Sequence, residues 1–392
     1  MSELSYLEKL LDGVEVELLP LGNITTIKTG QSVNKNMISD NPGEYPVINS
    51  GREPLGFIDI WNTDNDPMGI TTRGAGVGSV TWQDGKYFRG NLNYSVTISK
   101  EQSVSVRYLY HLLLEMQKEI KELCTFDGIP ALNASSLKKL LIPIPCPDNP
   151  EKSLAIQSEI VRILDTFTAL TDELTDELTM RKKQYNYYRD QLLSFEEDEV
   201  EWKTLGEIAE YSKARISFDL LDKNNYVGVD NLLQNRAGKI QSNYVPTSGN
   251  LTQFREGDIL IGNIRPYLKK IWQADLIGGT NGDVLVIRIC NKSISPRYLY
   301  QVLADDKFFE YNMQHAKGAK MPRGNKVAIL KYRIPVPSFD EQIRIVTILD
   351  KFDTLTNSIN EGLPREIELR QKQYEYYRDM LFSFPKPEVA EA

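Results

Sequence analysis

The feature that most constrains the fold is an internal duplication running through the whole chain. The block ILDTF at residues 163–167 returns as ILDKF at 348–352, and KQYNYYRD at 183–190 returns as KQYEYYRD at 372–379. Three shorter pairs keep the same order: LGNI and LGEI at 21 and 205, RYLY at 107 and 297, and IPIP and IPVP at 142 and 334. The offsets lie between 184 and 192 residues, too long for a solenoid unit. The sequence therefore predicts two similar halves related by approximate two-fold symmetry.

The first part of each half alternates short apolar runs with Gly, Pro and Asn turns, a pattern typical of strands. We expect strands at residues 58–61, 79–82, 259–261 and 284–289. Near the end of each part, residues 107–120 and 297–312 are expected to form helices. The fold class is thus α+β, with two similar mixed α/β domains.

The second part of each half predicts a long helix, because apolar residues recur there at steps of three and four. Such a stripe packs along another helix, and two duplicated helices pack most simply as an antiparallel coiled coil. Gly362 and Pro364 predict a break in the second helix, with Pro364 opening a new helical turn. The residues expected at the contact between these spacer helices are Ile163, Phe167, Leu170, Leu174, Leu178, Tyr188, Leu349, Phe352, Ile359 and Tyr377.

These patterns divide the chain into four segments. We expect a first domain at residues 1–145, including a short N-terminal helix, and a first spacer helix at 146–199. A second domain follows at 200–337, and a second spacer helix with a C-terminal tail at 338–392. Two similar domains on a stiff helical pair would bind two sites at a fixed separation.

Charge is distributed unevenly among the four segments. The whole chain carries a net charge of −8. In chain order, the segments carry 13 basic and 17 acidic residues (net −4), 6 and 13 (−7), 20 and 13 (+7), and 7 and 11 (−4). A strongly basic second domain beside acidic helices indicates local contact with a polyanion.

Basic residues near glycines are the candidates for that contact. The run 317–326 holds four cations among glycines that let a ligand approach the backbone. Arg73 and Arg265 share the 192-residue offset of the IPxP blocks, and each is expected on a turn after a strand, either contacting a phosphate or a guanine edge or simply solvated. The candidates in the second domain are Lys213, Arg215, Arg265, Lys269, Lys270, Lys317, Lys320, Arg323 and Lys326, and those in the first are Lys28, Lys35, Arg73, Lys86 and Arg89.

Other conspicuous residues are better explained by structure than by ligand binding. The glycine-rich run 72–78 lacks a following helix and predicts a tight turn, not a nucleotide loop. Asn133 and Asn325 are expected to cap helices, and His111 to be a packed histidine. The tyrosines of the YxYYRD blocks lie at helix ends, where packing on a neighbouring helix or on a partner subunit is expected, rather than service as stacking platforms.

Composition argues against catalysis by this chain. With only two histidines, the chain has little material for a catalytic triad or a His-rich metal site. Its three widely spaced cysteines do not suggest a disulfide framework or a zinc site, and they fit the reducing cytoplasm. The sequence has no Walker loop and no amino-methyltransferase motif, and no apolar run is long enough for a membrane helix. The start of the chain does not suggest a signal peptide.

The repeated blocks together resemble the specificity subunits of type I restriction-modification systems. The resemblance rests on the IPxP pairs, the ILDxF helices, the KQYxYYRD ends and the tandem TDEL at 171–178, and it covers nearly the whole chain. It implies two target-recognition domains that each recognise half of a bipartite, asymmetric DNA site. The helices would set the unread gap between the half-sites.

The resemblance also implies partners. Two methyltransferase (modification) subunits and two restriction-translocation subunits would carry the chemistry, using S-adenosylmethionine, ATP and Mg²⁺, with no cofactor on this chain. No membrane partner is expected. The alternative is a duplicated coiled-coil adaptor that bridges proteins without DNA specificity; the basic second domain argues against it, whereas the acidic first domain does not.

Overall fold

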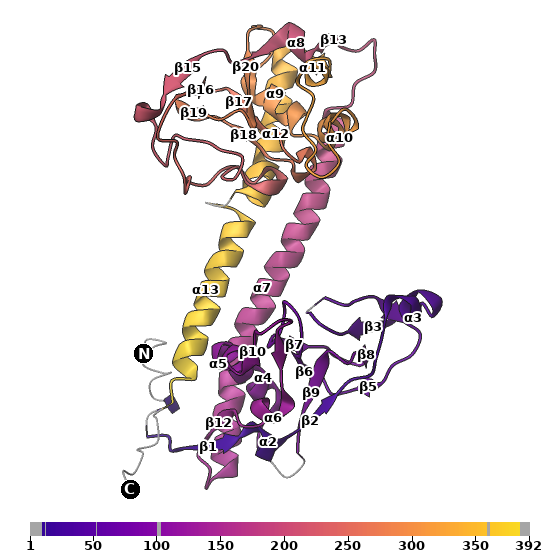
Figure 1. Cartoon of the computed structure of the whole chain (residues 1–392), viewed down its shortest axis with the longest axis vertical. Coiled ribbons are helices and arrows are strands. Elements are labelled where there is room, and N and C mark those ends of the chain that lie inside the picture. The colour runs from indigo at the N-terminus through magenta and orange to yellow at the C-terminus, as the bar shows by residue number, and fades with distance from the viewer. Residues whose placement is uncertain (1–9, 12, 52, 100–102, 359–360, 385–392) are drawn as a thin grey trace. The chain divides into compact units, whose positions relative to one another are not determined.

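The computed structural model describes residues 10–11, 13–51, 53–99, 103–358 and 361–384. The chain divides into two compact units, each shown in Figure 1: unit 1 comprises residues 1–170 and 370–392, and unit 2 comprises residues 171–369. Most of the predicted short N-terminal helix lies outside the described residues. In the described part of the chain, no helix combines the length and apolarity needed to cross a membrane.

Unit 1 is built around a four-stranded antiparallel sheet of order β2-β9-β6-β7. A second sheet, β4-β3-β8-β5, contains one parallel pair, and β1–β12 and β10–β11 form two-stranded sheets. Its strands are β1 (Val16–Pro20), β2 (Thr25–Thr29), β3 (Tyr45–Ile48), β4 (Phe57–Ile58), β5 (Thr63–Asp64), β6 (Met68–Thr71), β7 (Val80–Trp82), β8 (Lys86–Arg89), β9 (Asn93–Ile98), β10 (Cys124–Thr125), β11 (Ala131–Leu132) and β12 (Leu141–Pro145). Its helices are α2 (Leu21–Ile24), α3 (Lys35–Asp40), α4 (Val106–Glu115), α5 (Gln117–Glu122), α6 (Ala134–Leu137) and the ends of two long helices described below.

Unit 2 repeats this plan. Its main sheet has the order β14-β20-β17-β18, β13–β21 corresponds to β1–β12, and β15-β16-β19 forms a further sheet. Its strands are β13 (Glu201–Thr204), β14 (Ala209–Tyr211), β15 (Arg215–Ser217), β16 (Asn250–Phe254), β17 (Ile259–Gly262), β18 (Ile271–Gln273), β19 (Gly278–Thr280), β20 (Val284–Ile289) and β21 (Arg333–Val336). Its helices are α8 (Leu205–Ile208), η1 (Phe218–Leu220), η2 (Gln234–Arg236), η3 (Pro266–Leu268), α9 (Pro296–Leu303), α10 (Asp306–Gln314), α11 (Lys326–Ile329) and α12 (Phe339–Asn357).

The long helices are shared between the units along the sequence. Helix α7 (Pro150–Leu192) contributes its first part to unit 1 and its second part to unit 2, and α13 (Leu363–Leu381) begins in unit 2 and ends in unit 1. The predicted break is confirmed: α12 ends at Asn357, and Pro364 lies in the first turn of α13. Gly362 permits this break because its φ is +79° and a Cβ there would lie 2.4 Å from the carbonyl oxygen of Thr354.

The predicted elements are largely present, with two differences. Each expected helix at 107–120 and 297–312 is a pair of helices, α4–α5 and α9–α10. The expected strand at 58–61 reduces to β4, because Ile60 and Trp61 are exposed and lack the buried face that stabilises a longer strand. The α+β fold class is confirmed.

Candidate nucleic-acid interface

In unit 1, the repeated motifs meet at one polar cluster. Arg107 Nε donates to Asp165 Oδ1 at 2.7 Å, and His111 Nε2 lies 2.7 Å from the same oxygen. His111 Nδ1 lies 3.0 Å from the Tyr374 hydroxyl, and Arg378 pairs with Glu115. Together with Arg107, His111, Asp165 and Tyr374, these two residues form what we call the unit 1 junction. It fastens α4 to the start of α7 and the end of α13.

Burial decides the protonation of this junction. His111 is fully buried, and desolvation lowers its pKa despite the hydrogen bond to Asp165. Burial also raises the pKa of Tyr374 to about 12, so its hydroxyl keeps a proton to donate. A neutral imidazole satisfies both contacts, with Nε2–H donating to Asp165 and Nδ1 accepting from Tyr374.

Unit 2 builds an equivalent junction with one substitution. Arg297 Nε donates to Asp350 at 2.8 Å, and Gln301 Nε2 donates to the same carboxylate oxygen at 2.6 Å. The Tyr185 hydroxyl lies 3.3 Å from Gln301 Oε1 and also accepts from Arg189. We call these five residues the unit 2 junction. Gln301 thus replaces His111, because its amide can both donate and accept without titrating.

The junctions explain what the repeated motifs do. RYLY, ILDxF and YxYYRD supply the partners of one buried cluster in each unit, so they hold helices in place rather than face a ligand. His111 is a packed histidine, as expected. In each YxYYRD block the first tyrosine, Tyr185 or Tyr374, enters the junction, and the middle one, Tyr187 or Tyr376, is 61% or 56% exposed. The last tyrosine of each block stacks on a phenylalanine of the other long helix.

Contacts between the long helices follow the antiparallel order. Phe167 stacks on Tyr377 in unit 1, with ring centroids 5.0 Å apart, and Tyr188 stacks on Phe352 in unit 2 at 5.4 Å. A later residue of α7 therefore meets an earlier residue of the C-terminal helices. Among the other predicted contact residues, Leu349 is buried, Ile163 is partly buried against the unit 1 core, and Leu170, Leu174 and Leu178 are half-buried; Ile359 lies outside the described residues.

Two stronger packing residues were absent from the predicted contact set. Leu164 and Tyr185 are 0% and 3% exposed. Leu164 completes an i, i+4 stripe with Ile156 and Ile160 that enters the unit 1 core, and this spacing is visible in the sequence.

Unit 2 presents its basic residues on a turn and a hairpin. Lys317 and Arg323 pair across the hairpin, and Arg265 N donates to Pro322 O at 2.7 Å, joining the turn after β17 to it. Arg323 also donates to Asp283 at 2.6 Å. Neither Arg265 nor Lys320, both exposed, forms a side-chain hydrogen bond or ion pair with another described residue. The turn and hairpin therefore present two exposed cations, Arg265 and Lys320, beside Arg323, whose guanidinium is paired with Asp283.

The remaining candidates of unit 2 are more constrained. Lys213 is exposed and lies 3.4 Å from Glu210, and Arg215 donates to the Thr252 hydroxyl at 3.2 Å. Lys269 pairs with Asp306 at 2.8 Å, and desolvation lowers its pKa. Two further positions complete the set: Lys270 donates to Val229 O at 2.6 Å, and Lys326 lies above the Tyr211 ring.

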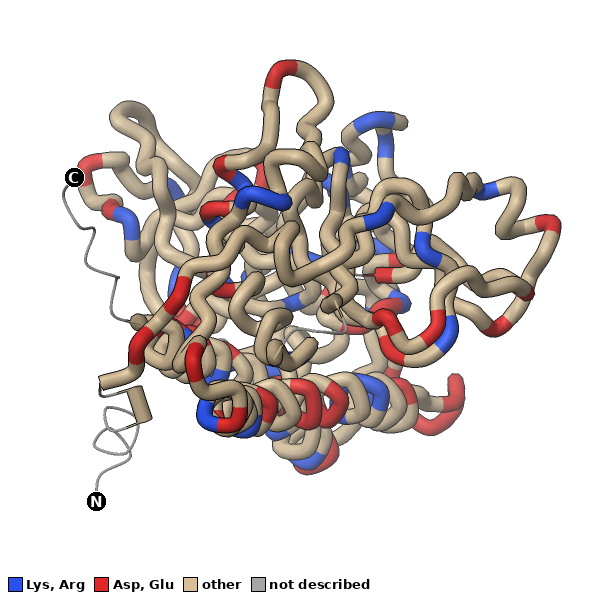
Figure 2. The backbone as a smooth tube through the Cα atoms, turned by 90° about the horizontal axis from the view of Figure 1, so that it is seen from below, with Lys and Arg blue, Asp and Glu red and all other residues tan. Residues whose placement is uncertain are grey.

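In unit 1 the exposed candidates are scattered. Lys28, Lys35, Arg73 and Lys86 all face solvent, and Lys86 lies 4.7 Å above the centroid of the Trp61 ring. Lys28 lines a surface pocket of about 330 Å³ together with Gln31, Asn62, Asp64 and six other residues. Side chains of these types can contact base edges. In Figure 2, Lys and Arg as well as Asp and Glu are seen both on the loops of the globular parts and along the long helices.

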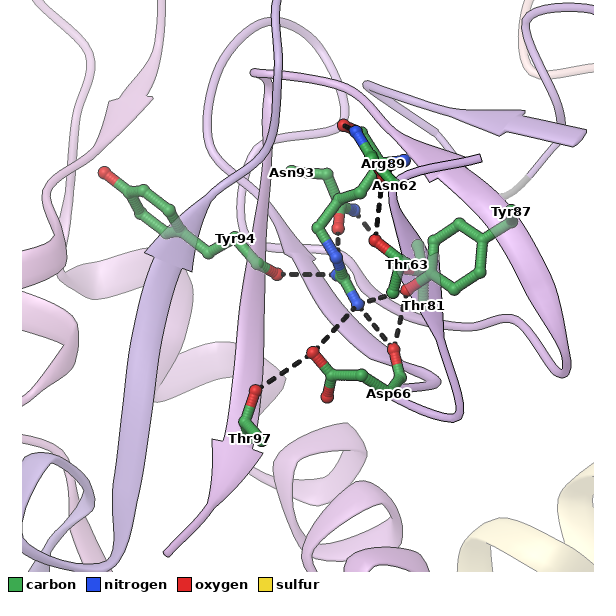
Figure 3. A network of polar contacts seen from close by, with 9 residues as sticks. All are labelled: Asn62, Thr63, Asp66, Thr81, Tyr87, Arg89, Asn93, Tyr94 and Thr97. Carbon is green, nitrogen blue, oxygen red and sulfur yellow. Dashed lines mark hydrogen bonds and ion pairs between the residues drawn. The ribbon is translucent and has the colours of Figure 1, made fainter. Parts of the chain in front are cut away.

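The structure corrects one member of the unit 1 set. Arg89 is only 3% exposed, and Figure 3 shows its guanidinium enclosed by polar groups. It donates to Asn93 Oδ1 at 2.6 Å, to Tyr94 O at 3.1 Å and to Asp66 O at 2.6 Å, and also to the Tyr87 hydroxyl. Arg89 therefore fastens the loop before β6 to β8 and β9, and it is not placed to meet a DNA phosphate.

A second correction concerns the expected equivalence of Arg73 and Arg265. In unit 1 it is Gly74 N that donates to Pro130 O, at 2.9 Å, as Arg265 N does to Pro322 O. Gly74, not Arg73, is thus the structural counterpart of Arg265. The two hairpins still correspond, since each precedes a short helix capped by the predicted asparagine: Asn133 accepts from Ser135 N, and Asn325 accepts from Val327 N.

These features define a class: an internally duplicated α+β protein in which repeated motifs build two junctions and the loops beyond them differ in charge. The chain belongs to the type I restriction modification DNA specificity family, whose domain model matches residues 13–180 and 197–369. It is 41% identical to the EcoR124I/EcoR124II specificity subunit of Escherichia coli, over 99% of each chain. It is 33% identical to the EcoprrI specificity subunit of Escherichia coli, over 92% of this chain and 93% of that one.

A solved structure has the same fold. The type I specificity subunit from M. genitalium matches with a TM-score of 0.64 and 19% identity, covering 96% of this chain and 97% of that chain. The family model and the two relatives at 41% and 33% identity, rather than this likeness of fold, identify the chain as a type I specificity subunit.

Proposed function

We propose that this chain supplies the DNA address of its complex. Each unit recognises one half of a bipartite, asymmetric duplex site, unit 1 through residues 1–145 and unit 2 through residues 200–337. The observation that carries this proposal is that the RYLY, ILDxF and YxYYRD motifs contribute residues to the two junctions, whereas the exposed loops outside them differ in charge between the units. Such loops can hold phosphates and contact base edges.

The helical segments 146–199 and 338–392 set the length of the unread gap and dock the partners. The partners are two modification subunits and two restriction-translocation subunits, in the cytoplasm where the DNA is. The chemistry belongs to those subunits: adenine N6 methylation with S-adenosylmethionine, and translocation and cleavage with ATP and Mg²⁺. This chain binds no cofactor and is not catalytic; its sequence lacks the motifs of those reactions.

Sequencing of host DNA for N6-methyladenine, with and without the gene for this chain, tests the proposal. We expect one methylated bipartite sequence that disappears when the gene is deleted. Persistence of every methylated motif in the deletion strain would contradict it. A gel shift with random duplex and the modification subunits separates it from the protein-only adaptor, which would leave the mobility of the duplex unchanged.

A further inference from the structure

The turn after β6 in unit 1 and the turn after β17 in unit 2 each hold a residue with positive φ at the corresponding position, but the residue type differs. Gly74 has φ = +91°, and its counterpart Arg265 has φ = +52°. Glycine adopts positive φ freely, whereas a side chain with a Cβ is disfavoured there. Unit 2 therefore has an arginine, Arg265, at a position where the corresponding residue of unit 1 is the less strained glycine, Gly74.

A second strained residue closes the same loop. Lys269 has φ = +51°, and the η3 turn between it and Arg265 carries Tyr267, which is 50% exposed. Leu268 N donates to Arg265 O at 2.9 Å, and Arg265 N donates to Pro322 O in the hairpin, so the conformation is held from both sides. Held strain of this kind is typical of sites where the side chain has a task.

The two strained cations are used differently. The Lys269 ammonium is paired with Asp306, so its charge anchors the loop. Arg265 is exposed, and its guanidinium makes no hydrogen bond or ion pair with another described residue. Lys320 and Arg323 lie on the adjoining hairpin and suit a polyanion. A free, pre-positioned arginine in such a surrounding has the fork geometry that matches the O6 and N7 edge of guanine.

We propose that Arg265 is a base-reading residue of the second half-site, presented by the left-handed turn to a guanine in the major groove. This inference rests on the proposed function, and it adds a specificity-determining side chain and the base it contacts. Arg73 precedes the equivalent turn position, so unit 1 does not present an arginine from this position.

The test uses the full chain assembled with its modification subunits. Arg265→Gly removes the guanidinium and relieves the strain, and Arg265→Asn does the same with a residue that tolerates positive φ. Asn65→Gly in unit 1 is the matched control, since Asn65 has φ = +51° and lies outside the basic loops. Unmethylated genomic DNA is treated with each complex and S-adenosylmethionine, and the methylated sites are sequenced.

We expect both Arg265 variants to melt at or above the wild-type temperature. Their sites should become degenerate at one guanine of the second half-site, with roughly tenfold or greater loss of discrimination there, while the first half-site and the gap stay unchanged. The Asn65→Gly control should keep the wild-type sequence.

Two outcomes would overturn this assignment. If the Arg265 variants kept full sequence discrimination in the second half-site, Arg265 would not read a base. A uniform loss of methylation with an unchanged recognition sequence would make Arg265 a phosphate contact. Failure of the wild-type complex to methylate any bipartite sequence would instead refute the proposed function itself.

Discussion

The two units are most alike at their junctions and least alike at their hairpins. In both, an arginine (Arg107 on α4, Arg297 on α9) donates to an aspartate of a long helix, and a tyrosine of the other long helix completes the cluster. Beyond the junctions, unit 2 carries a basic hairpin where unit 1 has residues 124–132 with no Lys or Arg. The duplication has kept the residues that pack the helices, whereas the hairpins have diverged in charge. Under the proposed function, identity between the halves marks scaffold and divergence marks recognition.

The largest expected effect comes from lengthening α7 at the end of its tandem TDEL repeat, ahead of the unit 2 junction residue Tyr185. Inserting one more Thr-Asp-Glu-Leu after Leu178 lengthens a straight helix by about 6 Å, close to two base pairs. We expect methylation of the original site to be lost and a site with the same half-sites and a gap longer by about two base pairs to replace it. Genome-wide mapping of methylated adenines measures this. Altered half-sites or an unchanged gap would contradict the proposal that the helices set the gap length while the units recognise the half-sites.

The next effect tests whether the scaffold is equally important in both units. Leu164→Ala and Leu349→Ala each remove a fully buried side chain and leave a cavity, at a cost of about 2–5 kcal/mol. Hydrogen exchange should accelerate in α4 for the first variant and in α9 for the second. Leu154→Ala, at a position 42% exposed, should change little. If either core variant left its own unit protected, the two junctions would not be equivalent.

The charge difference between the units predicts unequal losses of DNA binding. Replacing Arg265, Lys320 and Arg323 together with alanine should weaken duplex binding by about ten- to a hundredfold and flatten the salt dependence by about two to three in slope. The same change at Lys28, Lys35 and Arg73 should cost less. Both measurements use the chain assembled with its modification subunits.

Circular dichroism should confirm that both triple variants remain folded. Equal losses from the two triples would contradict the comparison between the units, and an unchanged salt slope would remove the unit 2 loops from the interface.

The sequence predicted the scaffold because duplication makes it visible. The repeated blocks contain most of the junction residues, among them Arg107, Asp165 and Tyr374, whereas His111, Glu115 and Gln301 lie outside the blocks. The i, i+4 spacing that buries Leu164 could also have been found. The sequence did not predict which individual Lys and Arg side chains are exposed and which are buried in polar networks. Arg89 resembles any exposed strand arginine until β8, β9 and the loop before β6 fold around it.

The counterpart of Arg265 was misassigned by one residue for a physical reason. The common offset pointed to Arg73, whereas the backbone hydrogen bonds pair Arg265 with Gly74. The two are equivalent because both have positive φ, and φ at an arginine cannot be inferred from the residue type.

The smallest predicted effect separates the junctions by pH. Desolvation lowers the pKa of His111 in the folded chain below its unfolded value of about 6.5, so the unfolded state binds the proton more readily. The stability of unit 1 should therefore fall as pH drops below about 6.5, by at most about 1.4 kcal/mol per pH unit for one proton. Gln301 does not titrate, and unit 2 should not share this dependence.

His111→Gln copies the unit 2 junction into unit 1 and should remove the pH dependence while keeping the hydrogen bonds to Asp165 and Tyr374. The charged groups that face the imidazole are Arg107 and Glu115 on α4, Asp165 on α7 and Arg378 on α13, and the variant keeps all of them. Hydrogen exchange in α4 compared with α9, measured from pH 7.5 to 5.5, gives the readout. Burial raises the pKa of Glu115 in the folded chain, so its protonation favours the folded state and does not produce a decline at the acid end. A decline in α4 that persisted in His111→Gln would show that His111 is not its source and would contradict this assignment.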